Sequence, residues 1–131
     1  MLRKLLIVAL AAWAAPALAQ LTPSGFLLWD YNTANFSLFS ISRFELQLDS
    51  AAFVSVGIPA TRNDAQTEAG SNTYGVAASG MIITVGNHTF SVRACSVAQC
   101  SLNNPVAGFT FSVPPPPPPV LAPPRNLRVL P

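Results

Sequence analysis

The only histidine and the two cysteines carry the most versatile side-chain chemistry in this 131-residue chain. His88 could serve as a general base, but a catalytic histidine works with a nucleophile and an orienting carboxylate, and the sequence shows neither beside it. Cys95 and Cys100 are spaced more widely than the Cys-x-x-Cys of redox catalysts. A metal site would need two further ligands, and no other cysteine or histidine stands near the pair. None of the three residues therefore predicts an active site.

The carboxylates are scattered rather than paired. Glu45 and Asp49 fall on the outward face of one predicted strand, and Asp64 and Glu68 fall in a polar loop. Asp64 and Glu68 could hold a weak calcium ion, but solvated loop charges are the commoner arrangement when a third acidic ligand is missing. The chain has no glycine-rich phosphate loop, no H-E-x-x-H and no G-x-S-x-G. We therefore expect no catalytic residue, no metal, no cofactor and no enzymatic activity.

Residues 1–19 have the three-part layout of a secretory signal peptide. Arg3 and Lys4 form a basic start, residues 5–15 are apolar, and Ala17-Leu18-Ala19 is a small-x-small cleavage site. A membrane anchor is the alternative, but a span needs about 20 apolar residues and this run is shorter. We expect cleavage after Ala19, a secreted, periplasmic or cell-surface location, and no membrane association afterwards.

Export has two consequences for the remaining residues. The formal charge of +2 belongs to Arg3 and Lys4, because the other five arginines balance the five acidic residues. No basic patch remains to bind nucleic acid or an anionic membrane. In an oxidising compartment, Cys95 and Cys100 are expected to form a disulfide, and a loop this short makes it worth about 2 kcal/mol.

From residue 26 to residue 113 the pattern has the period of two that is typical of β-strands, with no amphipathic helix. Strands are predicted at 26–31, 44–49, 53–58, 74–76 continuing to 81–83, 88–95 and 109–113, with an irregular or short-strand segment at 32–42 and a polar loop at 61–73. About seven short strands favour an all-β antiparallel sandwich, with a barrel as the alternative. The predicted core residues are Trp29, Phe44, Leu46, Leu48, His88, Phe90 and Val92.

This domain, residues 20–113, is followed by a proline-rich linker at 114–124. Its six consecutive prolines, 114–119, favour a polyproline II rod about 19 Å long at about 3.1 Å per residue. The rod could be a ligand for an aromatic groove, but outside the cytoplasm we expect a semi-rigid spacer.

Several segments resemble fibronectin type III domains. Residues 83–94 (ITVGNHTFSVRA) are similar to the E–F corner and F strand of that family, Leu27-x-Trp29 to its strand B, and residues 43–48 to its strand C. The resemblance implies an immunoglobulin-like antiparallel β-sandwich with Trp29 in the core. It also places His88 at the corner that usually holds a tyrosine, where a ring N–H would replace the hydrogen bond of the phenol.

Two departures from that family concern the ends of the domain. The region before Phe26 is too short for a full first strand, and residues 123–129 (PPRNLRV) are similar to the opening of a further type III module. One interpretation is a truncated tandem protein in which the tail, residues 125–131, is disordered. The other is that residues 127–130 supply the missing edge strand, to their own domain or to a neighbour.

Three functions fit such a module. The leading prediction is a non-catalytic adhesion or binding module that contacts a protein or glycan at a cell surface through loops 61–73 and 95–104. The second is a structural subunit of an extracellular fibre or virion appendage, self-associating through edge strands. The third is an accessory domain of a larger secreted hydrolase. Fold alone does not choose among them.

Overall fold

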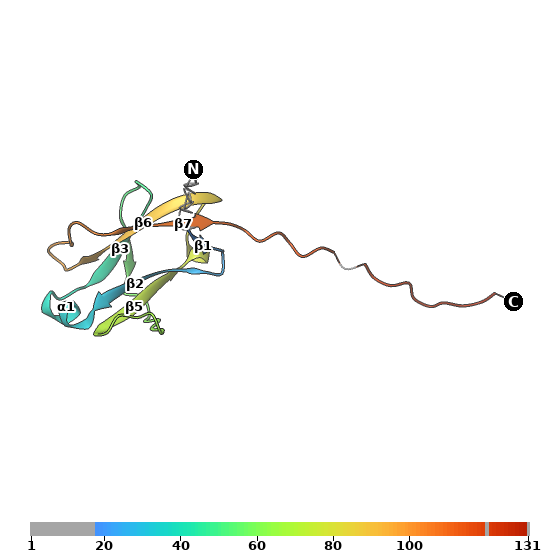
Figure 1. Cartoon of the computed structure of the whole chain (residues 1–131), viewed down its shortest axis with the longest axis horizontal. Helices are drawn as coiled ribbons and strands as arrows, with labels where there is room; N and C mark the ends of the chain where they lie inside the picture. Colours follow the sequence, from blue (N-terminus) through green and yellow to red (C-terminus); the bar gives the residue numbers. More distant parts are fainter. Residues whose placement is uncertain (1–17, 120, 131) are drawn as a thin grey trace, which may run out of the picture.

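A computed structural model describes residues 18–119 and 121–130, so most of the predicted signal peptide lies outside the described residues. The described chain forms strands, one short α-helix and one 3-10 turn (Figure 1). In chain order they are β1 (Ala19–Leu21), β2 (Phe26–Asn32), α1 (Thr33–Leu38), β3 (Arg43–Leu48), β4 (Val54–Gly57), β5 (Ser71–Ala77), η1 (Ala78–Gly80), β6 (Gly86–Cys95) and β7 (Val106–Phe111).

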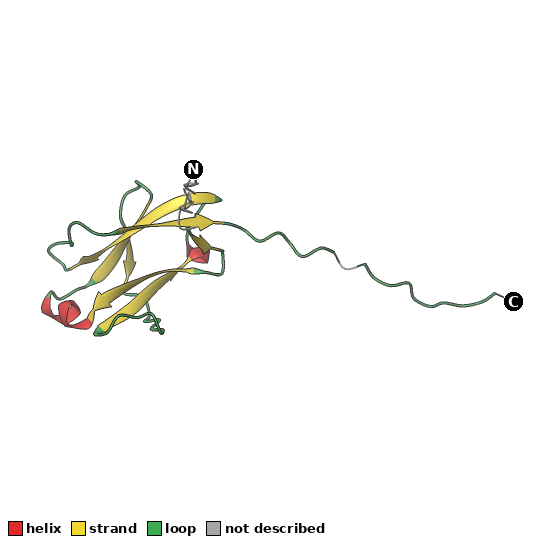
Figure 2. Cartoon of the chain, in the orientation of Figure 1, coloured by secondary structure: helices red, strands yellow, loops and turns green. Residues whose placement is uncertain are grey.

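The strands form two sheets, which confirms the all-β prediction (Figure 2). The larger sheet has the order β1-β7-β6-β3-β4, and the smaller sheet consists of β2 and β5. All strand pairs are antiparallel except β1 with β7, which is parallel. Side chains from the two sheets meet between them, because Leu27 of β2 and Leu46 of β3 belong to one buried cluster.

The alternation of β3 determines how the sheets pack. Phe44 and Leu46 point toward the smaller sheet and are 1% and 5% exposed. The ring of Phe44 lies 5.4 Å from those of Trp29 and Tyr31 and 4.9 Å from that of Tyr74, measured between centroids. Aromatic rings thus fill the space between the sheets, where edge-to-face contacts add to the burial of apolar area.

The other predicted core residues lie around this centre. Trp29, Leu48, Phe90 and Val92 are half-buried and pack against the buried clusters. The His88 side chain is 10% exposed. The remaining buried apolar residues are Leu21, Leu27, Tyr74, Ala78, Ala94, Cys95, Phe109 and Phe111.

Two segments differ from the expected strand pattern. Residues 33–38 form helix α1 because the side chain of Asn32 accepts hydrogen bonds from the N–H groups of Ala34 and Asn35 at 2.9 and 3.2 Å, which caps the first turn. Residues 81–83 form no strand. The pair Phe26 with Ala77 is already the first of the β2–β5 ladder, so no β2 residue is left to pair with them.

The chain before β2 forms a short strand rather than a full one. Residues 19–21 pair in parallel with residues 109–111 of β7, and Leu21 is buried against the core. Cleavage after Ala19 would leave Gln20 and Leu21 in this ladder. Since β1 pairs with β7 and not with β2, the smaller sheet stays at two strands in the described chain.

Beyond β7 the chain extends away from both sheets (Figure 1). The prolines at 114–119 and the tail residues 121–130 are exposed. Leu127, Val129 and Leu130 are 85%, 91% and 94% exposed. Within the described residues, no helix is long and apolar enough to cross a membrane.

Candidate functional site

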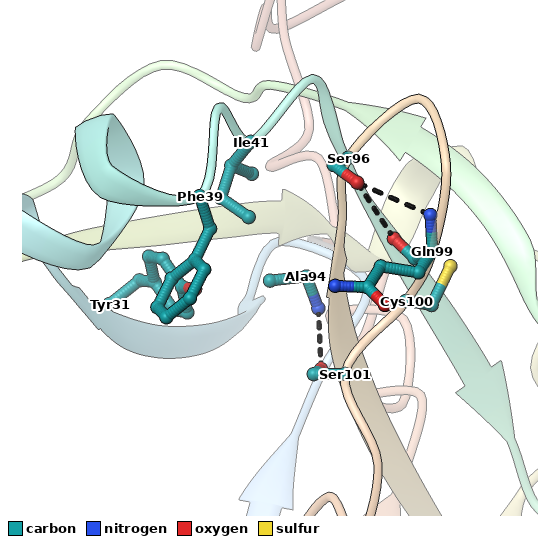
Figure 3. A pocket seen from close by; sticks show the side chains of 8 residues that line it. All are labelled: Tyr31, Phe39, Ile41, Ala94, Ser96, Gln99, Cys100 and Ser101. Atoms are coloured by element: carbon teal, nitrogen blue, oxygen red, sulfur yellow. Dashed lines mark hydrogen bonds between the residues drawn. The ribbon is translucent and has the colours of Figure 1, made fainter.

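A hollow of about 230 Å³ lies at the end of the domain where β2 and β6 finish (Figure 3). One wall comes from the end of β2 and from the segment between α1 and β3. The other wall comes from the end of β6 and the loop that the disulfide closes. The lining residues are Tyr31, Phe39, Ile41, Ala94, Ser96, Gln99, Cys100 and Ser101.

Helix α1 positions the aromatic wall. Phe36 anchors the helix, because its ring lies 6.5 Å from that of Tyr31 and 6.4 Å from that of Phe44. The helix ends at Leu38, and the next residue, Phe39, caps it by donating its N–H to the carbonyl oxygen of Asn35 at 3.0 Å. Phe39 stays 53% exposed, so the anchored helix holds an aromatic ring at the surface.

The opposite wall is a loop closed by the Cys95–Cys100 disulfide, as the sequence predicted. Within the loop, the Ser96 N–H donates to the Gln99 carbonyl at 2.8 Å, and the Ser96 hydroxyl oxygen accepts the Gln99 N–H at 3.2 Å. At the base of the loop, the Ser101 N–H donates to the Ala94 carbonyl at 2.8 Å. The covalent bridge and these hydrogen bonds fix the shape of the wall.

The lining of the hollow offers hydrogen-bonding groups and an aromatic surface but no catalytic pair. Burial raises the pKa of Tyr31, so its hydroxyl stays neutral, and the Cys100 sulfur is held in the disulfide. The serine and glutamine side chains supply hydrogen-bonding groups beside the aromatic wall. Three apolar residues adjacent to lining residues in the chain are strongly exposed: Leu38 (73%), Val97 (93%) and Leu102 (85%).

Glu45, which the sequence predicted on the outward face of its strand, is covered by two arginines. Its carboxylate accepts from Arg43 Nε at 2.7 Å and from Arg93 Nη2 at 2.6 Å, and the residue is 8% exposed. Hydrogen bonds from Arg43 and then Arg93 lower the pKa of Glu45. The Glu45 carboxylate and the sulfurs of Cys95 and Cys100 lie within 4.8 Å of one another, as the ligands of a metal ion would. The disulfide, however, leaves no thiolate to bind a metal, and the two arginines already bind the carboxylate. This cluster therefore does not suit a cation.

His88 has a carboxylate partner, contrary to the expectation that none lies beside it. Nδ1 lies 2.8 Å from Asp49 Oδ2 and Nε2 lies 2.6 Å from the Thr84 carbonyl oxygen. Both atoms are acceptors, so this geometry favours the protonated imidazole, in which both ring nitrogens donate. The Thr84 hydroxyl is 3.4 Å from Nε2, but a nitrogen that donates to the carbonyl cannot accept a proton from that hydroxyl. His88 therefore joins two turns and is not placed as a general base.

The pKa values of this pair shift in opposite directions. The hydrogen bond to Asp49, followed by the one to the Thr84 carbonyl, raises the pKa of His88 above its ordinary 6.5. The hydrogen bond from His88, followed by the one from the Thr89 N–H, lowers the pKa of Asp49 below its ordinary 3.8. Each charged group thus stabilises the charged form of the other.

Replacing His88 with glutamine is expected to remove a pH-dependent part of the stability. The raised pKa makes the histidine contribution complete below pH 6.5 and lost as the pH rises through the folded-state pKa. The lowered pKa makes the Asp49 contribution complete above pH 3.8 and lost as the pH falls through its folded-state pKa. The wild-type chain should therefore be more stable than the variant by the largest margin between pH 3.8 and pH 6.5. Urea midpoints at about pH 5 and about pH 9 measure this, and an equal difference at both would contradict a charged pair.

The polar loop at 61–73 contributes no residue to the hollow. The loop prediction is wrong for residues 71–73, which form the start of β5 and pair with the end of β2. The Arg62 N–H donates to the Thr73 carbonyl at 2.7 Å and holds the start of the loop against this strand. Asp64, considered above as a calcium ligand, accepts the Gln66 N–H at 2.8 Å and so caps its own turn. Of the two loops expected to make contact, only the disulfide loop lines the hollow. The aromatic wall was missed, because no helical pattern predicted α1, the helix that places Phe39 there.

No protein-family model, curated protein or solved structure matches this chain.

Proposed function

We propose that this chain is a non-catalytic secreted or cell-surface module that binds a partner through the hollow beside α1. An aromatic surface next to a disulfide-locked loop carries this proposal. Phe39 and the loop residue Val97 are exposed at 53% and 93% although both are apolar. Exposed apolar residues around a concavity are typical of sites that bind another molecule. A protein at a cell surface is the favoured partner, and a glycan is the alternative.

The rigidity of the site supports binding rather than chemistry. Fixing a loop before binding lowers the conformational entropy lost in the complex. Here the Cys95–Cys100 bridge and the hydrogen bonds of Ser96 and Gln99 fix the loop in advance. Binding energy at such sites concentrates in a few aromatic or apolar residues that enter or line a pocket. Phe39 occupies that position here.

Two further observations support an immunoglobulin-like sandwich of the fibronectin type III kind. Trp29, in the segment that resembles strand B of that family, packs between the two sheets. The His88 ring donates to the Thr84 carbonyl, four residues upstream, as the corner tyrosine of such domains does to its own upstream backbone. The disulfide also agrees with an oxidising compartment and hence with export.

Replacing Phe39 with serine is expected to weaken partner binding about tenfold or more, since aromatic hot spots contribute at least 1–2 kcal/mol. Immobilised wild-type and variant chains can be compared for capture of surface proteins from the producing cells and for binding to a glycan array. Val85→Ser is the matched control, because Val85 is 70% exposed and precedes β6 at its opposite end. Equal losses for both variants, or no loss for Phe39→Ser, would count against the hollow as the binding site.

A further inference from the structure

The smaller sheet has an open edge. β2 pairs with β5 over residues 26–32, and in residues 18–119 and 121–130 nothing pairs with its other edge. The far edge of β5 is partly covered, because Thr61 forms a bridge with Tyr74. The backbone N–H and C=O groups along the outer edge of β2 therefore remain available to a further strand.

A cleft of about 410 Å³ runs along this edge and separates β2 from β6 and from the loop before β7. Residues 28–31 of β2 line it, and no β5 residue does. Its wall is largely apolar, with Trp29, Tyr31, Phe90 and Val92 among the lining side chains. The indole Nε1 of Trp29 is buried and has no hydrogen-bond partner among the residues that the structure describes. A buried donor of this kind destabilises the fold unless an acceptor reaches it.

The tail at residues 125–130 has the pattern of a strand that could fill this cleft. Leu127 and Val129 alternate with Asn126 and Arg128, which places the two apolar side chains on one face of an extended chain. Both apolar side chains are almost fully exposed, at 85% and 91%. The tail therefore carries apolar surface with nothing to cover it in this structure.

The charges of tail and domain are complementary. Residues 18–113 hold three arginines and five carboxylates, a formal charge of −2, while the tail holds Arg125 and Arg128, a formal charge of +2. Asp30 lies in β2, the strand with the open edge. Opposite charges attract a tail to a domain and favour Arg128 on the side of the sheet that Asp30 occupies.

The rod between β7 and the tail directs the tail toward another molecule. Six consecutive prolines form a stiff spacer of about 19 Å, and it points away from both sheets (Figure 1). A tail that continues from its end lies far from the β2 edge of its own domain. A second copy of the chain can approach the tail without bending the rod.

We propose that residues 125–130 of one copy add as a strand to the outer edge of β2 in a second copy. Leu127 and Val129 enter the cleft, Arg128 lies on the outer face near Asp30, and the added backbone supplies a carbonyl acceptor for Trp29 Nε1. Because the donor and acceptor surfaces differ, the contact repeats from copy to copy and builds head-to-tail chains. The cleft shares Tyr31, Ala94 and Ser101 with the hollow. Phe39 does not line the cleft, so the Phe39→Ser variant tests partner binding at the hollow separately.

Sedimentation velocity of the purified chain over a range of concentrations tests the association. The wild-type chain should form dimers and longer species as its concentration rises, and the double variant Leu127→Asp/Val129→Asp should stay monomeric. Leu121→Asp is the matched control, because Leu121 is 93% exposed and precedes the proposed strand. Raised salt should weaken the association, since it screens the arginines from the acidic domain. Association that persists in the double variant would overturn the proposal.

A peptide of residues 123–130, added to the double variant, locates the contact. Trp29 is the only tryptophan after residue 13, so its emission should change as the peptide binds. A peptide with aspartate at both apolar positions should bind about tenfold more weakly or worse. Hydrogen exchange should slow in β2 and not in β4. Two results would refute donation between copies. One is protection in β4 alone. The other is a wild-type chain that stays monomeric at every concentration and whose β2 is already protected by its own tail.

Discussion

Replacing Phe44 with alanine should lower the free energy of unfolding by about 3–5 kcal/mol, the usual effect of deleting a fully buried aromatic ring. Phe44 is 1% exposed. Its ring contacts rings from both strands of the smaller sheet and from α1, so truncation leaves a cavity that no single side chain can fill. The rings in contact with it belong to Trp29, Tyr31, Phe36 and Tyr74.

Urea unfolding followed by Trp29 fluorescence measures this effect, because the Trp29 ring lies 5.4 Å from that of Phe44. Phe39→Ala is the matched control. It deletes the same ring from a site that is 53% exposed and should change the free energy of unfolding by no more than about 0.5 kcal/mol. Similar losses for the two variants would show that the rings between the sheets do not form the centre of the core.

Replacing both Cys95 and Cys100 with alanine should lower the free energy of unfolding by about 2 kcal/mol. The bridge joins residues with a sequence separation of 5, and so short a loop removes little entropy from the unfolded chain. The fractional loss of partner affinity should exceed the fractional loss of stability, because Cys100 and its neighbours in the loop line the hollow. A loosened loop would have to be ordered again by the partner.

Reduction of the wild-type chain with dithiothreitol distinguishes the stability contributed by the bridge from that contributed by the packing of Cys95, which is fully buried. The reduced chain should show most of the loss seen in the double variant, together with faster hydrogen exchange at Gln99, whose N–H is bonded within the loop. An unchanged urea midpoint after complete reduction would mean that backbone hydrogen bonds alone hold the loop.

Features that depend on near neighbours in the sequence were predictable. The alternation of β3 placed Phe44 and Leu46 on one face, and both are buried between the sheets. The cysteine pair was predicted from its compartment and spacing, and it forms a disulfide. In both cases the deciding interaction lies within a few residues, where the period of a strand or the length of a loop is informative.

Features that depend on distant partners were not predictable. Asp49 meets His88 across 39 positions and Glu45 meets Arg93 across 48. No local pattern signals such pairs, because they arise from the register between neighbouring strands, here Glu45 with Arg93. The α1 helix, residues 33–38, is too short for a helical period to be visible, and its cap is a single side chain.

The hollow combines both kinds of information. The loop that closes it could be read from the cysteines, but its aromatic wall depends on helix α1 ending beside the end of β6. The Ser42 N–H donates to the Cys95 carbonyl at 2.8 Å and ties the two segments together. That contact spans 53 positions in the chain and requires β3 and β6 to be paired in the larger sheet.

The parallel pairing of β1 with β7 bears on how the domain responds to mechanical force. Ala19 pairs with Phe109 and Leu21 with Phe111, so the chain enters β1 at one end of this pair and leaves β7 at the other. Tension applied between the start of β1 and the proline rod would slide the two strands along each other. The hydrogen bonds of the ladder, and that from the Ser112 N–H to the Leu21 carbonyl, would then bear the load together rather than break one at a time.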